Sequence, residues 1–204
     1  GMFTLWKDHT AVEEAALIND TAHSWGGTDY TKYSGGVYSS EWFFSKILHI
    51  LKTNKSVRKS VYSWVELADW IPAVLTGNEK PENIKRSRCA AGHKAMWHAS
   101  WEGLPSEEFL KEVDPLLSGL RHRLYNDTYT SDTSAGRLSR KWAEKLNLPS
   151  GIAVTVGAFD AHMGAVGAGV GKGSFIKIIG TSCCDMAVSP PETIGDRAVA
   201  GICG

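Results

Sequence analysis

Val154-Thr-Val-Gly-Ala-Phe-Asp-Ala-His-Met-Gly-Ala-Val-Gly-Ala-Gly-Val170 is the stretch that decides the fold class. Branched apolar residues alternate with small ones over residues 152–156, which is typical of a buried strand. Gly157 breaks that run, and Asp160 follows where a helix is expected to start. The residues behind Asp160 are small and apolar with glycines between them, so the helix is thin and open to close packing. The stretch therefore predicts a strand–turn–helix unit of an α/β protein.

Asp160 has two interpretations at this turn. A carboxylate between a strand and a helix faces the crevice beyond the carboxyl end of the strand, where open α/β sheets bind ligands. Asp is also among the best helix N-caps, and a capping role needs no ligand. The spacing alone does not decide between catalysis and capping.

A second informative stretch is Gly173-Ser-Phe-Ile-Lys-Ile-Ile-Gly-Thr-Ser-Cys-Cys-Asp-Met186. It predicts a strand that ends in Gly180, Thr181 and Ser182. Backbone amides freed by the glycine, with two hydroxyls beside them, can hold a phosphate oxygen. Gly-Thr-Ser is also a common turn, so this triplet alone does not establish phosphate binding.

Together the two stretches resemble the start of the second domain of the FGGY carbohydrate kinases. The sequences of residues 157–167 and 179–186 most resemble those of the family members that phosphorylate L-ribulose. The resemblance implies an α/β protein with the actin-like ATPase (ribonuclease H-like) fold. Residues 1–151 would be the C-terminal, mainly helical part of the first, sugar-binding domain. Residues 152–204 would begin the second, nucleotide-binding domain.

The first half of the chain predicts a strand and three helices. The strand is expected at residues 2–6, and Thr10 and Glu13 have the spacing of a capping box that opens a helix to about residue 22. Residues 25–36 are rich in Gly and Tyr and predict a loop. Ser40 is expected to cap a second helix, whose apolar face is Phe43, Phe44, Ile47, Leu48 and Leu51. A third helix ends at Thr76-Gly77, and Pro72 predicts a kink or a late start in it.

The later part predicts two more helices. One opens at Pro105-Ser106 and runs to Val113, and a turn follows at Asp114-Pro115. Residues 124–136 are polar and predict a connection. The other helix covers residues 138–146, and 148–151 end it at the expected domain boundary.

Two further residues are candidates for contact with a sugar. Residues 5–11 match the family's Trp-x-Asp-Arg segment, which implies that Trp6 lies near the sugar, although His9 stands where many members have Arg. Residues 92–97 are similar to a family segment whose lysine contacts the sugar, which implies the same for Lys94. Without the resemblance, Trp6 is equally a core residue at a strand end. Lys94 on that basis is a solvated or snorkelling lysine.

Composition excludes several classes of partner. Lys plus Arg and Asp plus Glu are both 22, so the net charge is zero and nothing favours nucleic acid or an anionic membrane. No apolar run approaches the roughly 20 residues that span a bilayer, and no signal peptide is visible. The cysteines at 89, 183, 184 and 203 lack the spacing of a zinc site and are expected to be reduced thiols. These features predict a cytoplasmic protein. A homodimer is its expected assembly, although nothing in the composition bears on that expectation.

The resemblance implies ATP-dependent phosphorylation of the terminal primary hydroxyl of a ketopentose, with L-ribulose as the expected substrate in L-arabinose catabolism. Asp160 would be the general base and a sugar contact. Gly180, Thr181 and Ser182 would lie against the phosphates of ATP, which is expected with Mg²⁺; no side chain is predicted to ligate a metal. The family's Asp-x-Gly-Thr loop and adenine segment are absent from the sequence, and both ends are abrupt. The chain is thus expected to be an internal fragment that is inactive alone.

Two alternatives remain open at this point. A sugar- or nucleotide-binding protein on the same fold would transfer no phosphate and would need no carboxylate at position 160. An α/β scaffold for protein contacts would have no pocket near Asp160. Cys183 stands where the resemblance implies Thr, which bears on fine geometry more than on function.

Overall fold

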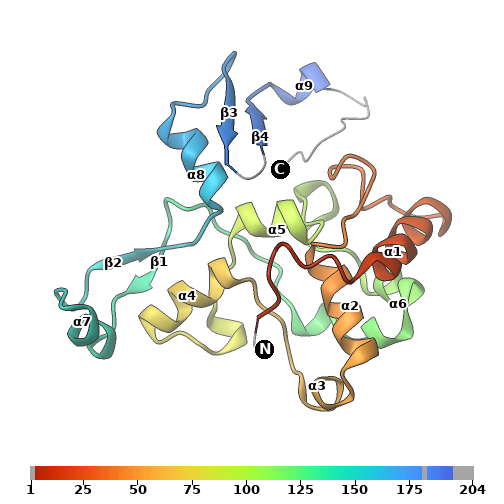
Figure 1. Cartoon of the computed structure of the whole chain (residues 1–204), viewed down its shortest axis with the longest axis horizontal. Coiled ribbons are helices and arrows are strands. Elements are labelled where there is room, and N and C mark those ends of the chain that lie inside the picture. Colours follow the sequence, from red (N-terminus) through yellow and green to blue (C-terminus); the bar gives the residue numbers. More distant parts are fainter. Residues whose placement is uncertain (1–2, 181–182, 195–204) are drawn as a thin grey trace.

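The computed structural model describes residues 3–180 and 183–194 (Figure 1). Its α-helices are α1 (Val12–Ser24), α2 (Phe43–Thr53), α3 (Lys55–Ser60), α4 (Leu67–Thr76), α5 (Arg88–Lys94), α6 (Glu107–Val113), α7 (Arg140–Leu146), α8 (Asp160–Gly167) and α9 (Pro191–Ile194). Short 3₁₀ helices are η1 (Pro81–Asn83), η2 (Ala99–Trp101), η3 (Pro115–Leu117) and η4 (Arg121–Arg123). Its strands are β1 (Ser134–Arg137), β2 (Ala153–Thr155), β3 (Phe175–Ile179) and β4 (Cys183–Ala187), which pair antiparallel as β1–β2 and β3–β4. Within these described ranges, no helix has the length and apolar character that a bilayer crossing requires.

The hydrophobic core lies where α1, α2 and α6 meet (Figure 1). The apolar face predicted for α2 is confirmed, since Phe43, Phe44, Ile47, Leu48 and Leu51 are all buried. Phe109 of α6 packs in the same cluster, and Ser106 caps α6 by accepting a hydrogen bond from the Phe109 N–H. The helices predicted at residues 106–113 and 138–146 are both present.

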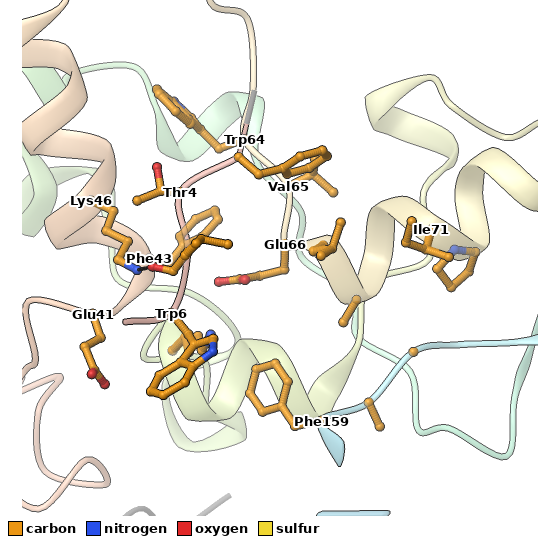
Figure 2. Close-up of a pocket in the computed structure, with 18 of the residues that line it drawn as sticks. Thr4, Trp6, Glu41, Phe43, Lys46, Trp64, Val65, Glu66, Ile71 and Phe159 are labelled. Atoms are coloured by element: carbon orange, nitrogen blue, oxygen red, sulfur yellow. Dashed lines mark hydrogen bonds between the residues drawn. The ribbon is translucent and has the colours of Figure 1, made fainter. Parts of the chain in front are cut away.

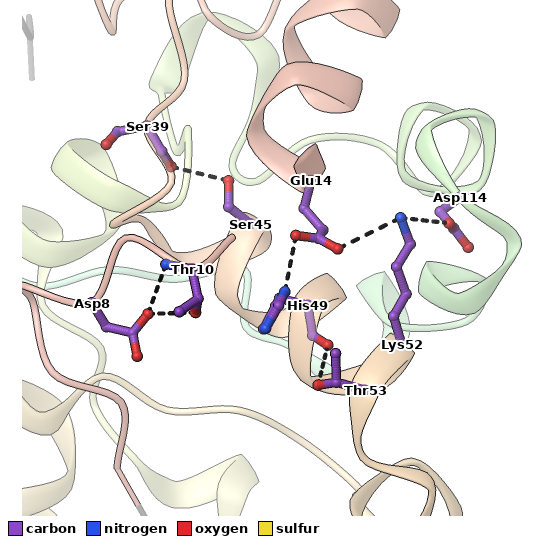
Figure 3. Close-up of polar contacts among 9 residues, drawn as sticks. All are labelled: Asp8, Thr10, Glu14, Ser39, Ser45, His49, Lys52, Thr53 and Asp114. Carbon is purple, nitrogen blue, oxygen red and sulfur yellow. Dashed lines mark hydrogen bonds and ion pairs between the residues drawn. The ribbon is translucent and has the colours of Figure 1, made fainter. Parts of the chain in front are cut away.

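A buried acid joins three elements of this core (Figure 3). Glu14 of α1 is 4% exposed and pairs with His49 at 3.1 Å and with Lys52 at 3.7 Å, both on α2. Lys52 also pairs with Asp114, which precedes η3, at 3.7 Å. A buried carboxylate that lost such partners would be strongly destabilising. These ion pairs therefore hold α1, α2 and the end of α6 in register.

Helix α4 meets the strand–turn–helix segment at an unusually close contact. Pro72 lies inside α4 and has no N–H to donate to the carbonyl of Ala68, four residues earlier. Gly157 lies against that carbonyl, so that a Cβ at position 157 would fall 2.0 Å from the Ala68 oxygen. Helix α4 begins at Leu67, five residues before Pro72, so Pro72 does not delay its start, and Gly77 ends the helix in the left-handed conformation, at φ 77°.

The thin helix α8 packs on β3, as the small residues predict. A Cβ at Gly164 would lie 3.2 Å from the end of the Ile178 side chain, so an added side chain there would require Ile178 to shift. Strands β3 and β4 pair antiparallel, a pairing that the sequence did not predict. Lys177 and Asp185 face each other in its register and form an ion pair at 2.7 Å.

Two predictions for the N-terminal segment are wrong. The described residues of 2–6 form no strand, because no strand lies beside them to complete a ladder; instead, Lys46 of α2 donates a hydrogen bond to the Leu5 carbonyl. The capping box does not form either. The hydroxyl and the N–H of Thr10 donate to Asp8 Oδ1 at 2.6 and 3.0 Å (Figure 3), so Thr10 closes a turn. Helix α1 begins at Val12 without a side-chain cap.

Three other expectations need correction. Ser40 does not cap α2, which follows Trp42 without a side-chain cap. The connection at 124–136 contains the first residues of β1, because Ser134 onward pairs with β2. Strand β2 is not buried, since it has β1 as its sole partner in the described sheet and both Ala153 and Thr155 are exposed.

The contact at Gly157 generates a stability prediction. Gly157→Ala places a methyl group on the backbone of Ala68, so α4 or the 154–160 segment must shift. Overpacking of this kind lowers the free energy of unfolding by about 1–3 kcal/mol. Urea unfolding followed by tryptophan fluorescence measures it. Gly167→Ala, in α8 with no atom within 4 Å of the added Cβ, is the control and should be neutral or stabilising by up to ~1 kcal/mol. Equal stabilities for the two variants would contradict the account.

Candidate active site

A pocket of about 670 Å³ lies where the two halves of the chain meet (Figure 2). Its wall comes from residues 3–6, from α2, from residues 64–72 at the start of α4, from the last residue of α5, and from residues 154–160. The volume is within the range of about 300–1,000 Å³ typical of small-molecule sites. Aromatic side chains and charged groups share the lining, which suits a ligand with both hydroxyl groups and carbon faces.

Trp6, Lys94 and Asp160, the residues predicted to contact the sugar, all line this one pocket. They come from positions far apart in the chain and from both sides of residue 151. Trp6 is 57% exposed, so the interpretation of Trp6 as a core residue is wrong. Its exposed indole offers a flat apolar face at the pocket wall (Figure 2).

Lys94 owes its position to α5. Ser87 caps this helix by accepting a hydrogen bond from the Ala90 N–H, and Lys94 is its last residue. The Lys94 Nζ lies 4.7 Å from the centre of the Phe159 ring, a cation–π contact between α5 and the residue before α8. Lys94 is partly buried in the pocket wall, not freely solvated. Its ammonium is therefore held against Phe159, and Lys94 and Asp160 line the same pocket.

Asp160 is the first residue of α8, and the cap position is occupied by Phe159, which makes no side-chain cap hydrogen bond. The alternative that Asp160 is the N-cap of this helix is therefore wrong. Its side chain is exposed and lines the pocket. The N-terminal end of a helix stabilises a carboxylate placed there. The geometry leaves the carboxylate available to a ligand.

Other charged residues of the pocket were missed by sequence reasoning. Glu41, Lys46 and Glu66 line it together with Lys94 and Asp160. Burial raises the pKa of Glu66, and the nearby Lys94 and Lys46 oppose that rise. Burial and the neighbouring Lys94 lower the pKa of Lys46. The one signal in the sequence was that Glu66 is a lone charge between Val65 and Leu67, where an amphipathic helix begins.

Behind the pocket, a polar cluster joins α5 to α8. The Cys89 Sγ lies 2.8 Å from His162 Nδ1 and accepts a long hydrogen bond of 3.5 Å from the Phe159 N–H. His93 packs edge-on against Phe159, and its Nδ1 is buried without a hydrogen-bond partner among the described residues. Burial, with repulsion from His162 and Lys94, lowers the pKa of His93 to about 4. The cluster supports the backbone that carries Asp160.

The residues predicted to meet the nucleotide are only partly placed. Gly180 follows β3, is exposed, and does not line the pocket. Thr181 and Ser182 lie outside the described residues. The role of these three residues at the phosphates stays a prediction.

Comparisons of the sequence with curated proteins identify close relatives. The chain is 54% identical over 203 residues to a ribulokinase from Vibrio parahaemolyticus, covering 100% of the chain and 36% of that protein. It is 38% identical to the ribulokinases of Shouchella clausii and Halalkalibacterium halodurans, covering 98% of the chain and 34% of each. The chain thus spans about a third of the length of these curated relatives. No protein-family model matches it.

Comparison with solved structures confirms the fold. A crystal structure described as a xyloylose kinase from Brucella ovis superposes with a TM-score of 0.69 at 19% identity, over 90% of this chain and 34% of that one. At that identity the likeness concerns the fold alone. The α/β, actin-like ATPase fold expected from residues 154–186 is therefore confirmed.

The buried His93 generates a pH prediction. The pKa of His93 is about 4 in the folded chain, below the ordinary histidine value of 6.5, so the unfolded chain takes up the proton first as the pH falls. The free energy of unfolding is then unaffected by His93 above pH 6.5 and falls by up to about 3 kcal/mol between pH 6.5 and 4. Urea unfolding across this range measures the slope.

His93→Gln should flatten that slope, because it removes the titrating group. His122→Gln, at an exposed position, is the control for loss of a histidine and should leave the slope unchanged. A His93→Gln variant with the wild-type slope would contradict the assignment of the buried imidazole.

Proposed function

We propose that this chain, which belongs to the FGGY carbohydrate kinases of the ribulokinase type, is the sugar-binding part of an enzyme that phosphorylates a ketopentose. The substrate is L-ribulose and the reaction transfers the γ-phosphate of ATP to its terminal primary hydroxyl. The single observation that carries this proposal is the convergence of Trp6, Lys94 and Asp160 on one pocket. The ribulokinase names of the relatives support the choice of sugar.

Each pocket residue has a distinct part in this reaction. Trp6 offers an apolar face to the carbon side of the sugar. Lys94 donates hydrogen bonds to its hydroxyl oxygens. Asp160 accepts the proton of the terminal hydroxyl while the hydroxyl oxygen forms a bond to the γ-phosphorus and the bond from phosphorus to the β,γ-bridging oxygen breaks. ADP and the sugar phosphate are the products.

The nucleotide is assigned to residues 180–182. Gly180 is exposed at the end of β3, so its backbone is accessible to a phosphate group, as this assignment requires. Mg²⁺ that arrives with ATP supplies positive charge to the phosphates. No group of three or more His, Cys, Asp or Glu side chains within the described ranges is arranged to hold a metal ion.

We also propose the domain boundary at residue 151. Trp6 and Lys94 then belong to the first domain, and Asp160 belongs to the second. The pocket accordingly spans the boundary, with the sugar held mainly by the first domain and its reactive hydroxyl presented to the second. Strands β1 and β2 pair across residue 151, so the two parts are also tied by backbone hydrogen bonds.

Asp160→Asn tests the proposed base. In the complete kinase this substitution keeps the size of the side chain but removes the proton acceptor. We expect kcat for L-ribulose to fall by roughly 10²–10⁴-fold while the sugar KM changes little. Steady-state assay of ADP release measures both quantities. Asp127→Asn, at an exposed position, is the control and should keep wild-type kinetics. Turnover within a few fold of wild type would favour a sugar-binding protein in which Asp160 has no catalytic part.

Lys94→Ala tests the sugar contact. Loss of the ammonium removes a donor to the sugar, so we expect KM for L-ribulose to rise at least tenfold and kcat to fall. Lys145→Ala is a matched control, because Lys145 lies 5.0 Å over the Trp142 ring in a similar cation–π contact on α7, away from the pocket. If the two variants have the same KM as wild type, Lys94 is not a sugar ligand.

A further inference from the structure

Glu66 is a carboxylate at a helix start that does not cap the helix. It occupies the N-cap position of α4, at φ −71° and ψ 148°, and makes no side-chain cap hydrogen bond. An Asp or Ser at this position would turn back to the helix N–H groups. The longer Glu66 side chain instead lines the pocket, and Figure 2 shows its carboxylate pointing into the cavity on the side of Trp6 and Lys46.

The protein leaves this carboxylate without a direct partner. Within the described residues, Glu66 forms no ion pair within 4.0 Å and accepts no hydrogen bond, although it is partly buried. Lys94 and Lys46 act on it only at longer range. Lys46 is turned away to the Leu5 carbonyl, and Lys94 lies over Phe159. Both carboxylate oxygens are therefore available to accept hydrogen bonds from a molecule in the pocket.

Another carboxylate of the same helix shows what a structural role looks like. Asp69 lies three residues further on and is 3% exposed. Its Oδ1 accepts a hydrogen bond of 2.7 Å from the Ser87 N–H, and its Oδ2 lies 3.7 Å from Arg86. Asp69 thus fastens α4 to the start of α5. Glu66 has no such contacts, and its side chain lines the pocket instead.

We propose that Glu66 is a further sugar-binding residue, whose carboxylate accepts a hydrogen bond from a secondary hydroxyl of the ketopentose and thereby selects its configuration. The inference rests on the proposed function and deepens it. A hydroxyl is the natural partner, because it donates to the carboxylate while its oxygen remains free to accept from Lys94. In this proposal Glu66 contacts neither the transferred phosphate nor the reactive hydroxyl, whose proton Asp160 accepts.

Selectivity follows from the cost of an unpaired group. A sugar whose hydroxyl points the other way displaces water from the pocket and leaves the partly buried Glu66 carboxylate without a donor. A site built to hydrogen-bond a substrate hydroxyl discriminates far more strongly than an apolar pocket. The lysines cannot replace Glu66 in this part, because an ammonium accepts no hydrogen bond.

The test uses the complete kinase and the four 2-ketopentoses, which differ only in configuration at C3 and C4. Steady-state kcat and KM are measured for wild type, Glu66→Gln and Glu66→Ala with D- and L-ribulose and D- and L-xylulose. Glu66→Gln keeps the shape and one acceptor oxygen, so folding should be retained, as thermal unfolding will verify. We expect KM for L-ribulose to rise about tenfold in Glu66→Gln and further in Glu66→Ala. The kcat should stay within a few fold, and the ratios of kcat/KM between the four sugars should shrink.

Asp69→Asn is the matched control. It removes a carboxylate charge from the same helix, so we expect a lower Tm with unchanged ratios between the sugars. Wild-type ratios in both Glu66 variants would overturn the inference while the proposed function stands. Changes in the sugar ratios that Asp69→Asn reproduces would also overturn it, because they would indicate a general disturbance of α4. A wild-type kinase that phosphorylates none of the four sugars would overturn the proposed function, and this inference with it.

Discussion

The structure depends on the contact between Gly157 and the Ala68 carbonyl. Pro72 creates it by withholding the N–H that would otherwise occupy this carbonyl inside α4. The missing side chain at Gly157 then lets the 154–160 segment lie directly on the helix backbone. The pocket exists because this contact brings Asp160 to the same space as Trp6 and Lys94. A side chain at position 157 would move the proposed base away from the residues proposed to hold the sugar.

The pocket contains carboxylates that form no ion pair with other described residues. The ion pairs of Glu14 with His49 and of Asp69 with Arg86 are closed within the structure, and each joins two elements. Glu66 and Asp160 line the pocket without such partners in the described part of the chain. Charges left unpaired at a pocket are costly unless a ligand or water meets them. This contrast, more than the pocket's size, indicates that the site is built for a polar molecule such as a sugar.

The parts of this account that could be predicted from the sequence are local. The burial of the apolar face of α2 follows from its helical periodicity, and the close packing of α8 follows from its small side chains. Trp6, Lys94 and Asp160 were identified through sequence segments shared with a family, not through any spacing in the chain. Their meeting in one pocket required the structure.

Other features could not be predicted, for physical reasons. Thr10 and Ser40 had the right type and spacing for caps, but Thr10 donates to Asp8 instead and α2 begins only after Trp42. A capping pattern shows that a side chain is able to cap a helix. Whether it does so depends on the hydrogen-bond partners that the neighbouring backbone and side chains offer. Glu66 was missed because its importance lies in an absence of partners, which only the packing of α2, α4 and α5 reveals.

The central claim is that one sugar molecule meets residues from both sides of position 151. A crystal structure of the complete kinase with L-ribulose and without nucleotide tests it most directly. The account predicts sugar density in the pocket, with the terminal hydroxyl within hydrogen-bond distance of Asp160 and other hydroxyls on Lys94 and Glu66. Sugar bound elsewhere, or bound in the pocket with its terminal hydroxyl turned away from Asp160, would contradict it.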